Sequence, residues 1–234
     1  MTDPAPTSPE QDGINLYSEK SLHIALKSWY AQPGDRFEVE VDGSVIDVVR
    51  DDLLIEIQTK NFSALKRKLT RLLDHHRVRV VHPVPQARWI VKLGADGKRQ
   101  SRRKSPIKGS VYHVFSELVY VHHLMAHPNL SLDVLLVHEE EIRCNDGKGS
   151  WRRKGWSICD RRLLQVNESY GFATPQDLAE LLPESLPEAF TTAHLAKAIG
   201  QRRRIAQQMT YCLKHMAMIE MVGKQGNAHV YTRL

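Results

Sequence analysis

The sequence predicts an α/β fold, in which a mixed β-sheet is covered by helices and followed by a smaller C-terminal module. Two observations carry this prediction. Between residues 18 and 93, the apolar periodicity indicates a helix, three strands, a second helix and two further strands, in that order. Residues 53–59 begin with a nearly continuous apolar run, which is typical of a strand buried in the middle of a sheet.

The first helix is predicted for residues 18–30. Ser18 can cap it, and Glu19 lies in the first turn, where the helix dipole favours an acid. Leu22 and Leu26 give the helix an apolar stripe, and the Pro-Gly pair that follows ends it.

Three strands of a meander follow. Residues 36–41 and 44–49 alternate between apolar and polar, and Asp42-Gly43 between them is a dipeptide typical of a tight hairpin turn. A second turn at Asp51-Asp52 leads into residues 53–59, the third strand. We then expect a helix over residues 63–74.

Beyond this helix the pattern is less regular. Residues 78–82 and 89–93 are predicted as two strands joined by a Pro-containing turn, and the polar, basic segment 94–109 as a loop. We expect a helix over residues 111–126, a long strand over residues 132–143 and a Gly-rich loop over residues 145–156.

The predicted organisation has a leader, a large domain, a linker and a small domain. The bounds are 1–14 for a disordered leader, 15–170 for the α/β domain with core motifs in 18–93 and an extension in 109–170, 171–187 for the linker and 188–234 for the C-terminal domain.

The bulk composition favours a polyanionic partner. The formal net charge is +6, and basic residues gather in four segments. Cationic surfaces bind nucleic acid favourably because they release counterions from its phosphates. The four segments are residues 60–71, 98–108, 148–154 and 202–204.

Membrane and secretory classes are not indicated. The chain has no apolar run that approaches the roughly 20 residues needed to cross a bilayer, and its polar, Pro-rich start does not look like a signal peptide. Cys144, Cys159 and Cys212 have no paired metal-ligand spacing, and a disulfide framework is not expected. We therefore expect a cytoplasmic protein.

Two carboxylates are placed to meet at one point of the meander. Asp47 and Glu56 lie on adjacent predicted strands, close to the turn that joins them. Paired carboxylates suit Mg²⁺, which prefers hard oxygen ligands and keeps several of its waters. Such a metal acidifies a bound water and neutralises a phosphate under attack, so the pair points to phosphodiester hydrolysis. The alternative is a sheet with exposed acids beside a turn.

At these residues the chain resembles the PD-(D/E)XK nuclease superfamily. The resemblance covers residues 18–93 and rests on Glu19, on Asp47, on Glu56-Ile57-Gln58 and on the order of elements. It implies that Asp47 and Glu56 are ligands of Mg²⁺ or Mn²⁺, and that Glu19 is an auxiliary acid.

Gln58 is a departure from the superfamily, which usually has lysine at this position. An amide can orient water but cannot carry charge or exchange a proton. Lys60 lies two residues further along the same face, and we hypothesise that it takes over the electrostatic role.

The C-terminal segment resembles the winged-helix family. Helices over residues 194–199 and 202–218 are followed by a hairpin with strands at 219–222 and 229–232. In a DNA-binding winged helix, the start of the second helix enters the major groove. This implies that Gln201 and the three arginines 202–204 meet DNA, with Lys224 at the wing; the alternative is a module for protein docking or dimerisation.

Other features are read more plainly. His122, His123 and His127 are interpreted as packing or surface residues, because no acid or cysteine completes a ligand set. Residues 139–141 are interpreted as a solvated strand end. Trp151 and Trp156, which flank basic residues, either stack on bases or anchor a glycine loop.

The resulting functional prediction is a metal-dependent endonuclease that acts on DNA. The alternatives are a DNA-binding regulator or adaptor on a degenerate nuclease core, and a structural partner in a larger complex. A homodimer is consistent with the first, because cutting both strands of a duplex usually needs two sites. The predicted DNA-binding residues are Lys66, Arg67, Arg102, Arg103, Lys104, Arg152, Arg153, Arg202, Arg203, Arg204 and Lys224.

Overall fold

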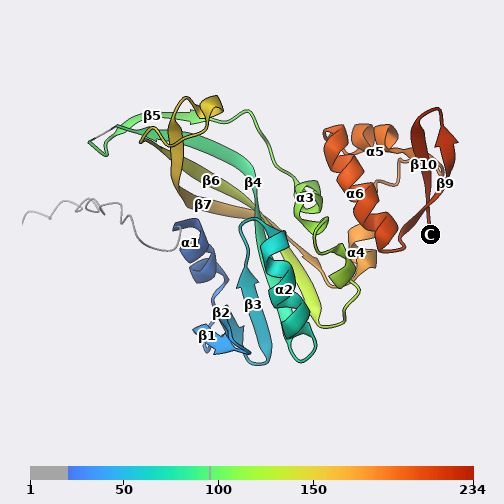
Figure 1. Cartoon of the computed structure of the whole chain (residues 1–234), viewed down its shortest axis with the longest axis horizontal. Coiled ribbons are helices and arrows are strands. Elements are labelled where there is room, and N and C mark those ends of the chain that lie inside the picture. The colour runs from blue at the N-terminus through green and yellow to red at the C-terminus, as the bar shows by residue number, and fades with distance from the viewer. Residues whose placement is uncertain (1–20, 95) are drawn as a thin grey trace, which may run out of the picture.

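A computed structural model describes residues 21–94 and 96–234. Within them, a mixed sheet has the strand order β1-β2-β3-β4-β6-β7, and β5 pairs with β4 (Figure 1). The strands are β1 (Arg36–Val41), β2 (Ser44–Arg50), β3 (Leu53–Ile57), β4 (Arg77–Leu93), β5 (Arg99–Lys104), β6 (Leu130–Asn145) and β7 (Trp156–Phe172). The α/β class and the mixed sheet predicted from the sequence are confirmed.

The N-terminal part follows the predicted order of elements. Helix α1 (Ser21–Tyr30) precedes the antiparallel meander β1-β2-β3, and α2 (Phe62–Leu73) connects β3 to the parallel strand β4. Asp42 and Gly43 both have positive φ, at 47° and 66°, as a tight hairpin turn of this type requires. Ser18 and Glu19 lie outside the described residues.

The two helices cover opposite faces of the sheet beside β3 (Figure 1). Leu22 and Leu26 of α1 pack with Ile55 and Ile57 on one face. On the other face, the α2 stripe of Leu65, Leu69, Leu72 and Leu73 packs into the larger core. Because both faces are covered, β3 has buried side chains on both sides, as its apolar run predicted.

The prediction of two strands at 78–82 and 89–93 was wrong, because β4 is one strand of 17 residues. It pairs with parallel β6 from Val78 to Leu93, and the register shifts between Pro85 and Ala87. A bulge at Gln86 absorbs the irregularity that the prolines introduce, so the strand bends and continues.

Two further segments differ from the prediction. The expected loop 94–109 contains β5, an exposed strand that pairs with the distal part of β4. The expected helix 111–126 is broken into three short helical segments, of which the first two contribute buried side chains to the core. They are η1 (Val111–Val114), α3 (Phe115–Leu118) and η2 (His122–Leu124).

Strand β7 was not predicted from the sequence. Without it, the sequence analysis also failed to predict a disulfide between two of the cysteines. β6 and β7 are antiparallel neighbours joined by a loop that contains η3 (Trp151–Arg153). They bring Cys144 and Cys159 together in a disulfide, with 6.0 Å between the Cα atoms. The cysteine argument for the cytoplasm therefore falls away, because disulfides persist mainly in oxidising compartments.

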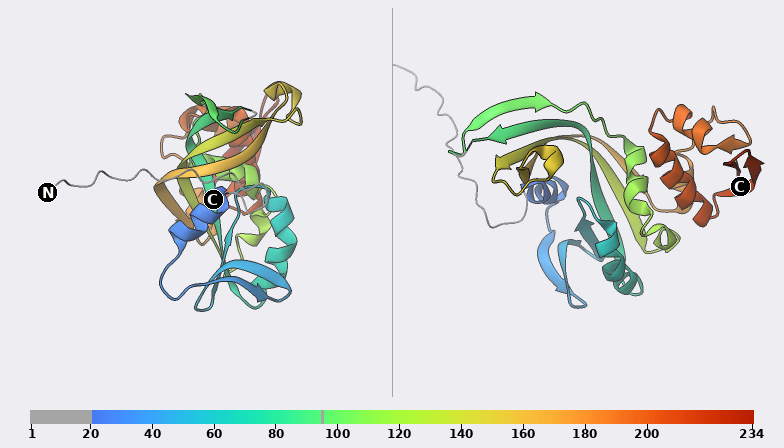
Figure 2. Two further views of the ribbon diagram at one scale, coloured as in Figure 1. Left: turned by 90° about the vertical axis from the view of Figure 1, so that its left-hand side faces the viewer. Right: turned by 45° about the horizontal axis from the view of Figure 1, so that its top comes forward.

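The C-terminal module has the predicted two helices and hairpin. Its elements are β8 (Phe190–Thr191), α5 (Thr192–Ala198), α6 (Arg203–His215), β9 (Ile219–Gln225) and β10 (Ala228–Arg233). Thr191 caps α5 by accepting the His194 N–H at 3.3 Å. The module lies at the end of the sheet opposite β5 (Figure 2).

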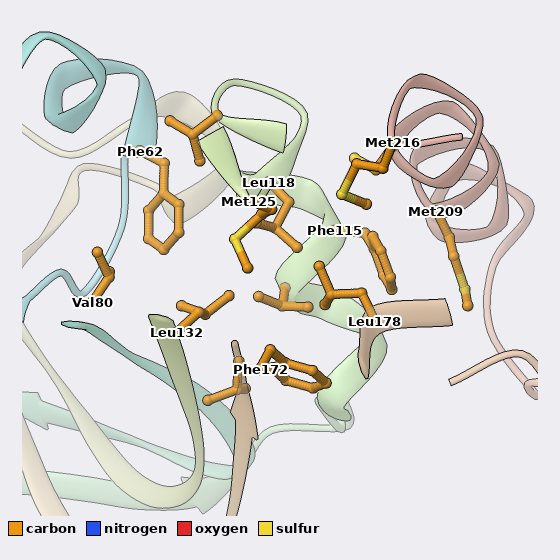
Figure 3. Close-up of a cluster of buried hydrophobic side chains, with 14 of the residues drawn as sticks. Phe62, Val80, Phe115, Leu118, Met125, Leu132, Phe172, Leu178, Met209 and Met216 are labelled. Carbon is orange, nitrogen blue, oxygen red and sulfur yellow. The ribbon is translucent and has the colours of Figure 1, made fainter. Parts of the chain in front are cut away.

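One hydrophobic core joins the module to the sheet. Phe115 and Leu118 of α3 lie between the sheet side chains and Met209 of α6 (Figure 3). The segment expected as a linker contains α4 (Pro175–Ala179), whose Leu178 is fully buried in the same core. No helix among the described residues is long and apolar enough to cross a membrane.

Candidate functional site

Three acidic residues lie on one rung across β1, β2 and β3. The flanking pairs Phe37↔Val48 and Val39↔Ile46 set Glu38 opposite Asp47. The β2–β3 register, continued by one step from Val48↔Ile55, sets Asp47 opposite Glu56.

Residues directly opposite each other in an antiparallel pair have Cβ atoms about 5 Å apart. The meander therefore brings the two predicted carboxylates, Asp47 and Glu56, together. It also adds Glu38, which has a φ of 51° and interrupts the ladder. We refer to Glu38, Asp47 and Glu56 as the acidic rung.

Asp47 is held between β3 and α1. One of its carboxylate oxygens, Oδ2, accepts the Ile57 N–H at 2.7 Å and lies 3.2 Å from His23 Nε2. The Lys27 ammonium lies 3.7 Å from Oδ1. Burial raises the pKa of Asp47, but the hydrogen bonds from His23 and Ile57 outweigh it, and the pKa lies below its usual value. Asp47 is therefore a carboxylate at neutral pH.

Glu56 is more deeply enclosed and pairs with a lysine of α2. The residue is 6% exposed, and its Oε1 is in an ion pair with Lys68. Its other oxygen, Oε2, is buried without a hydrogen-bond partner among the residues that the structure describes. An orphaned, buried carboxylate oxygen is costly, so this atom marks a place where a further cation would be stabilised.

Lys68 and Lys27 supply positive charge from the two opposite helices. Lys68 also donates to Val45 O at 2.6 Å. Its burial lowers its pKa, and the negative charges of Asp47 and Glu38 partly offset this effect. Lys27 pairs with Glu38 as well as with Asp47. The acidic rung is thus neutralised by lysines from both faces of the sheet.

Gln58 is held by the start of α2, and the role hypothesised for Lys60 stays a prediction. The Gln58 amide donates to Lys60 O at 2.5 Å and to Asn61 O at 3.3 Å, which ties it to the start of α2. Lys60 is exposed. Lys68, which the sequence analysis did not assign to the site, makes the ion pair with Glu56. One signal could have identified it: Lys68 interrupts the apolar stripe of α2, at i+3 from Leu65 and i−4 from Leu72.

The donor set is compatible with a hard cation only in part. Oxygen ligands suit Mg²⁺ or Mn²⁺, and the orphaned Glu56 Oε2 fits such a ligand. Across residues 21–94 and 96–234, however, no three His, Cys, Asp or Glu side chains form a ready-made metal site. Asp47 and Glu56 would therefore be the protein ligands, with water completing the shell.

The predicted DNA-binding residues lie on several surfaces. Lys66 and Arg67 line an exposed groove on the outer side of α2. Arg102, Arg103 and Lys104 lie on exposed β5. The remaining predicted residues are Arg152 and Arg153 in η3, Arg202, Arg203 and Arg204 at the exposed start of α6, and Lys224 on β9.

Some of these cations are engaged within the protein. Arg102 donates to Glu140 at 2.6 Å and lies over the Trp89 ring. Arg153 donates to Trp156 O at 3.1 Å. Arg102 and Arg153 are therefore held in place by the sheet and by the η3 loop, whereas Arg103 and Arg202 are exposed.

The two tryptophans of the η3 loop have different environments. Trp151 is 82% exposed. Trp156 is partly buried under the Lys92 ammonium, which lies 4.3 Å from its ring centroid. Trp156 therefore anchors the loop, and Trp151 is the ring that can meet a partner.

The interpretation of residues 139–141 as a solvated strand end was wrong. Glu139 and Glu141 are 1% and 2% exposed. Arg88 donates to Glu139 at 2.6 Å, and Arg143 donates to Glu141 at 2.6 Å. The acids can be buried because β4 and β7 flank this part of β6 and bring Arg88 and Arg161 close to them. Sequence periodicity alone does not show which strands are neighbours.

The histidines around residue 122 pack between the two parts of the chain. The His122 ring lies 5.3 Å from Tyr211 and 5.2 Å from His215 of α6, centroid to centroid. Burial lowers the pKa of His122, and the nearby His215 and Lys66 lower it further. These rings thus form part of the contact between η2 and α6.

Comparison with known proteins places this chain in a family. Residues 20–173 match the family described as a domain of unknown function, DUF8091. The chain belongs to this family. It is also 37% identical over 222 residues to an uncharacterized protein of Treponema pallidum (strain Nichols), covering 94% of this chain and 87% of that protein. No solved structure matches it.

The DUF8091 match contains the acidic rung and both lysines that face it. It ends at residue 173, directly after β7. The C-terminal module with α5, α6 and the hairpin lies beyond the segment that matches the family. The alignment with the Treponema protein covers 94% of this chain and therefore includes most of this module.

Proposed function

We propose that this DUF8091 protein is a divalent-metal-dependent endonuclease that cleaves phosphodiester bonds in DNA. The observation that carries the proposal is the acidic rung, in which the β2–β3 register sets Asp47 opposite Glu56 and the partly buried Lys68 pairs with Glu56. The order α1-β1-β2-β3-α2-β4 also agrees with the PD-(D/E)XK core. Phosphodiester hydrolysis needs this combination of clustered carboxylates and a nearby ammonium.

In this proposal the residues have distinct tasks. Asp47 and Glu56 hold Mg²⁺ or Mn²⁺, which when bound neutralises phosphate charge and acidifies water. His23 and the Ile57 N–H fix the orientation of Asp47 and keep it ionised. Lys68 provides the positive charge that Gln58 cannot carry, and its lowered pKa makes proton exchange easier than for an ordinary lysine.

The DNA partner is supported by charge rather than by a groove of known shape. Exposed basic residues lie on α2, on β5, in the η3 loop and at the start of α6. We infer that the C-terminal module is a winged helix, with Arg202 to Arg204 at the start of its second helix and Lys224 on the wing. A homodimer would supply two acidic rungs, one for each strand of a duplex.

A non-catalytic DNA-binding adaptor is the second candidate, and one observation favours it. The Gln58 amide nitrogen donates to the backbone carbonyls of Lys60 and Asn61, so this nitrogen is not available as a donor to a water at the acidic rung.

A cleavage assay distinguishes the two candidates. Plasmid, linear and branched DNA are incubated with the native chain and Mg²⁺ or Mn²⁺, beside Asp47→Ala and Glu56→Ala. Asp52→Ala, an exposed acid in the β2–β3 turn, is the matched control. We expect metal-dependent cutting by the native chain and the control only. DNA binding without cutting in all four proteins would favour the adaptor.

A further inference from the structure

A cavity of about 260 Å³ opens where β3 ends, next to the start of α2. Thr59, which follows Gln58, lines it together with His82 of β4, and the segment after β5 closes it with Ile107, His113 and Glu117. Pockets for drug-sized ligands run from about 300 to 1,000 Å³. This cavity therefore suits a smaller group, about the size of one or two fused rings.

The two histidines of the cavity offer opposite hydrogen-bonding character. His82 Nδ1 donates to Gln58 O at 2.7 Å, so Nε2 is left as an acceptor. His113 Nδ1 accepts the Ser110 N–H at 3.1 Å, so Nε2 carries the proton and is a donor. Burial lowers the pKa of both rings, which keeps them neutral.

Glu117 adds a carboxylate to the same wall. Its Oε2 accepts the Phe62 N–H at 2.9 Å, which holds the side chain at the start of α2. A carboxylate only accepts hydrogen bonds. Glu117 and His82 therefore offer acceptors, and the His113 N–H is a donor. Two further polar groups of the lining are already bonded within the protein, because Arg88 pairs with Glu139 and Glu141 and the Ser116 hydroxyl donates to His113 O.

Apart from Arg88 and Ser116, which also line the cavity, the remaining walls are mainly apolar. Val84, Pro83 and Ile107 line the cavity. Gly109 donates its N–H to Pro85 O at 2.9 Å, and a Cβ at Gly109 would lie 2.5 Å from that oxygen. Glycine therefore lets the closing segment lie directly against the bulge of β4 and form one wall of this cavity, which we refer to as the slot.

We propose that this cavity binds a single nucleobase that carries an exocyclic amino group. Such a base has flat apolar faces for the slot, an exocyclic amino group that donates to Glu117, and a carbonyl or ring nitrogen that accepts from His113. Lys60 and Lys108, chain neighbours of the lining residues Thr59 and Gly109, are exposed cations that suit the attached phosphate.

The base would come from a nucleic-acid strand or from a free nucleotide. Only the first of these two sources depends on the proposed nuclease function. Thr59 is three residues after Glu56, so a base in the cavity lies beside the strand end that carries the acidic rung. A strand held by one unstacked base would be positioned there for cleavage, at a cost of unstacking that is smallest for single-stranded or mismatched DNA.

Binding is tested with the full-length chain in a chelator, so that cleavage cannot intervene. GMP, AMP, CMP and UMP are titrated by calorimetry, with ribose 5-phosphate and inorganic phosphate as base-free probes. We expect the three amino-bearing nucleotides to bind more tightly than UMP, and the base-free probes to bind at least roughly tenfold more weakly.

The variants test the cavity itself. Glu117→Gln and His113→Leu should each weaken binding of the preferred nucleotide by roughly tenfold, and Glu184→Gln, an exposed acid, should not. Ile107→Trp, at a position that is 61% exposed, should block the slot without burdening the core. The inference is overturned if Ile107→Trp and Glu117→Gln bind as the native chain does, or if ribose 5-phosphate matches the nucleotides.

Two further arms separate the sources and the hypotheses. Single-stranded DNA that competes with the bound nucleotide, and abasic DNA that does not, would assign the base to a strand; no competition by either would assign it to a free nucleotide. Asp47→Ala should retain nucleotide binding. Nucleotide binding without any metal-dependent cleavage would therefore remove the proposed function and leave this inference standing.

Discussion

The ammonium of Lys68 and the carboxylate of Glu56 meet where little water reaches them. Their side chains are 21% and 9% exposed. An ion pair in such a place gains little over apolar residues of the same size, but removal of one partner leaves an uncompensated charge. The pair is therefore a sensitive probe of the site, whether or not the protein cleaves DNA.

We expect Lys68→Met to lower the free energy of unfolding by about 3 kcal/mol, because Glu56 is then buried without its partner. Combining it with Glu56→Gln should restore much of the loss, because no charge then remains buried. Urea denaturation measures both. Lys66→Met, on the exposed side of α2, is the control, and an equal loss in the control would contradict the expectation.

Asp47 gives the site a defined dependence on pH. Its pKa in the folded state lies below its usual value, so its contribution to stability is complete above the pKa of the unfolded chain, about 3.9. That contribution is lost as the pH falls through the folded-state pKa. We expect Asp47→Asn to be less stable than the native chain at neutral pH.

The measurement is denaturation of both proteins at neutral pH and near pH 3. The stability difference between them should shrink at the acidic end, because the unfolded chain takes up the proton at a higher pH than the native carboxylate, whose pKa is lowered. A difference that stays constant over this range would show that Asp47 contributes through its shape or neutral hydrogen bonds instead of its charge.

The elements that the sequence predicted well are those whose signals are local. The β1–β2 turn is encoded by Asp42-Gly43. The burial of β3 on both faces is encoded by its apolar run. The convergence of Asp47 and Glu56 follows from the same meander. The missed elements depend on distant partners: β5 pairs with the far end of β4, and β7 pairs with β6 across the η3 loop.

The missing parts of the site have the same origin. Glu38 joins the acidic rung only through the β1–β2 register, and Lys27 and Lys68 reach it from helices on opposite faces of the sheet. The buried Glu139 needs Arg88 from β4. Periodicity identifies which side of an element is apolar, but it does not say which charged residue of another element meets it.

Under the proposed DNA-binding function, the exposed Trp151 of the η3 loop predicts a preference for unpaired bases. Stacking on an aromatic side chain contributes about 1–3 kcal/mol per base, and duplex DNA has no free base face to offer. We expect Trp151→Ala to weaken single-stranded DNA binding by roughly tenfold and duplex binding much less. Fluorescence anisotropy measures both affinities. Trp29→Ala, 49% exposed on α1, should change neither.

At the scale of the whole molecule, the sheet domain and the C-terminal module share one core. Buried side chains of one core extend from Phe62 of α2, through Phe115 of α3 and Leu178 of α4, to Met209 of α6 (Figure 3). A module connected only by a flexible linker would unfold by itself. Here, each part covers apolar surface of the other, so we expect them to unfold together.

Leu178→Ala tests this coupling, because Leu178 is fully buried between the two parts. The cavity should lower stability by about 2–5 kcal/mol. The four tryptophans all lie in the first 156 residues, so their fluorescence reports the sheet domain, while amide hydrogen exchange in α6 reports the module. Both should shift together in the variant, because loss of the shared core removes packing from each. Leu164→Ala, 46% exposed on β7, is the control. If α6 exchanged faster while the tryptophan transition stayed unchanged, the module would be an independent unit despite the continuous core.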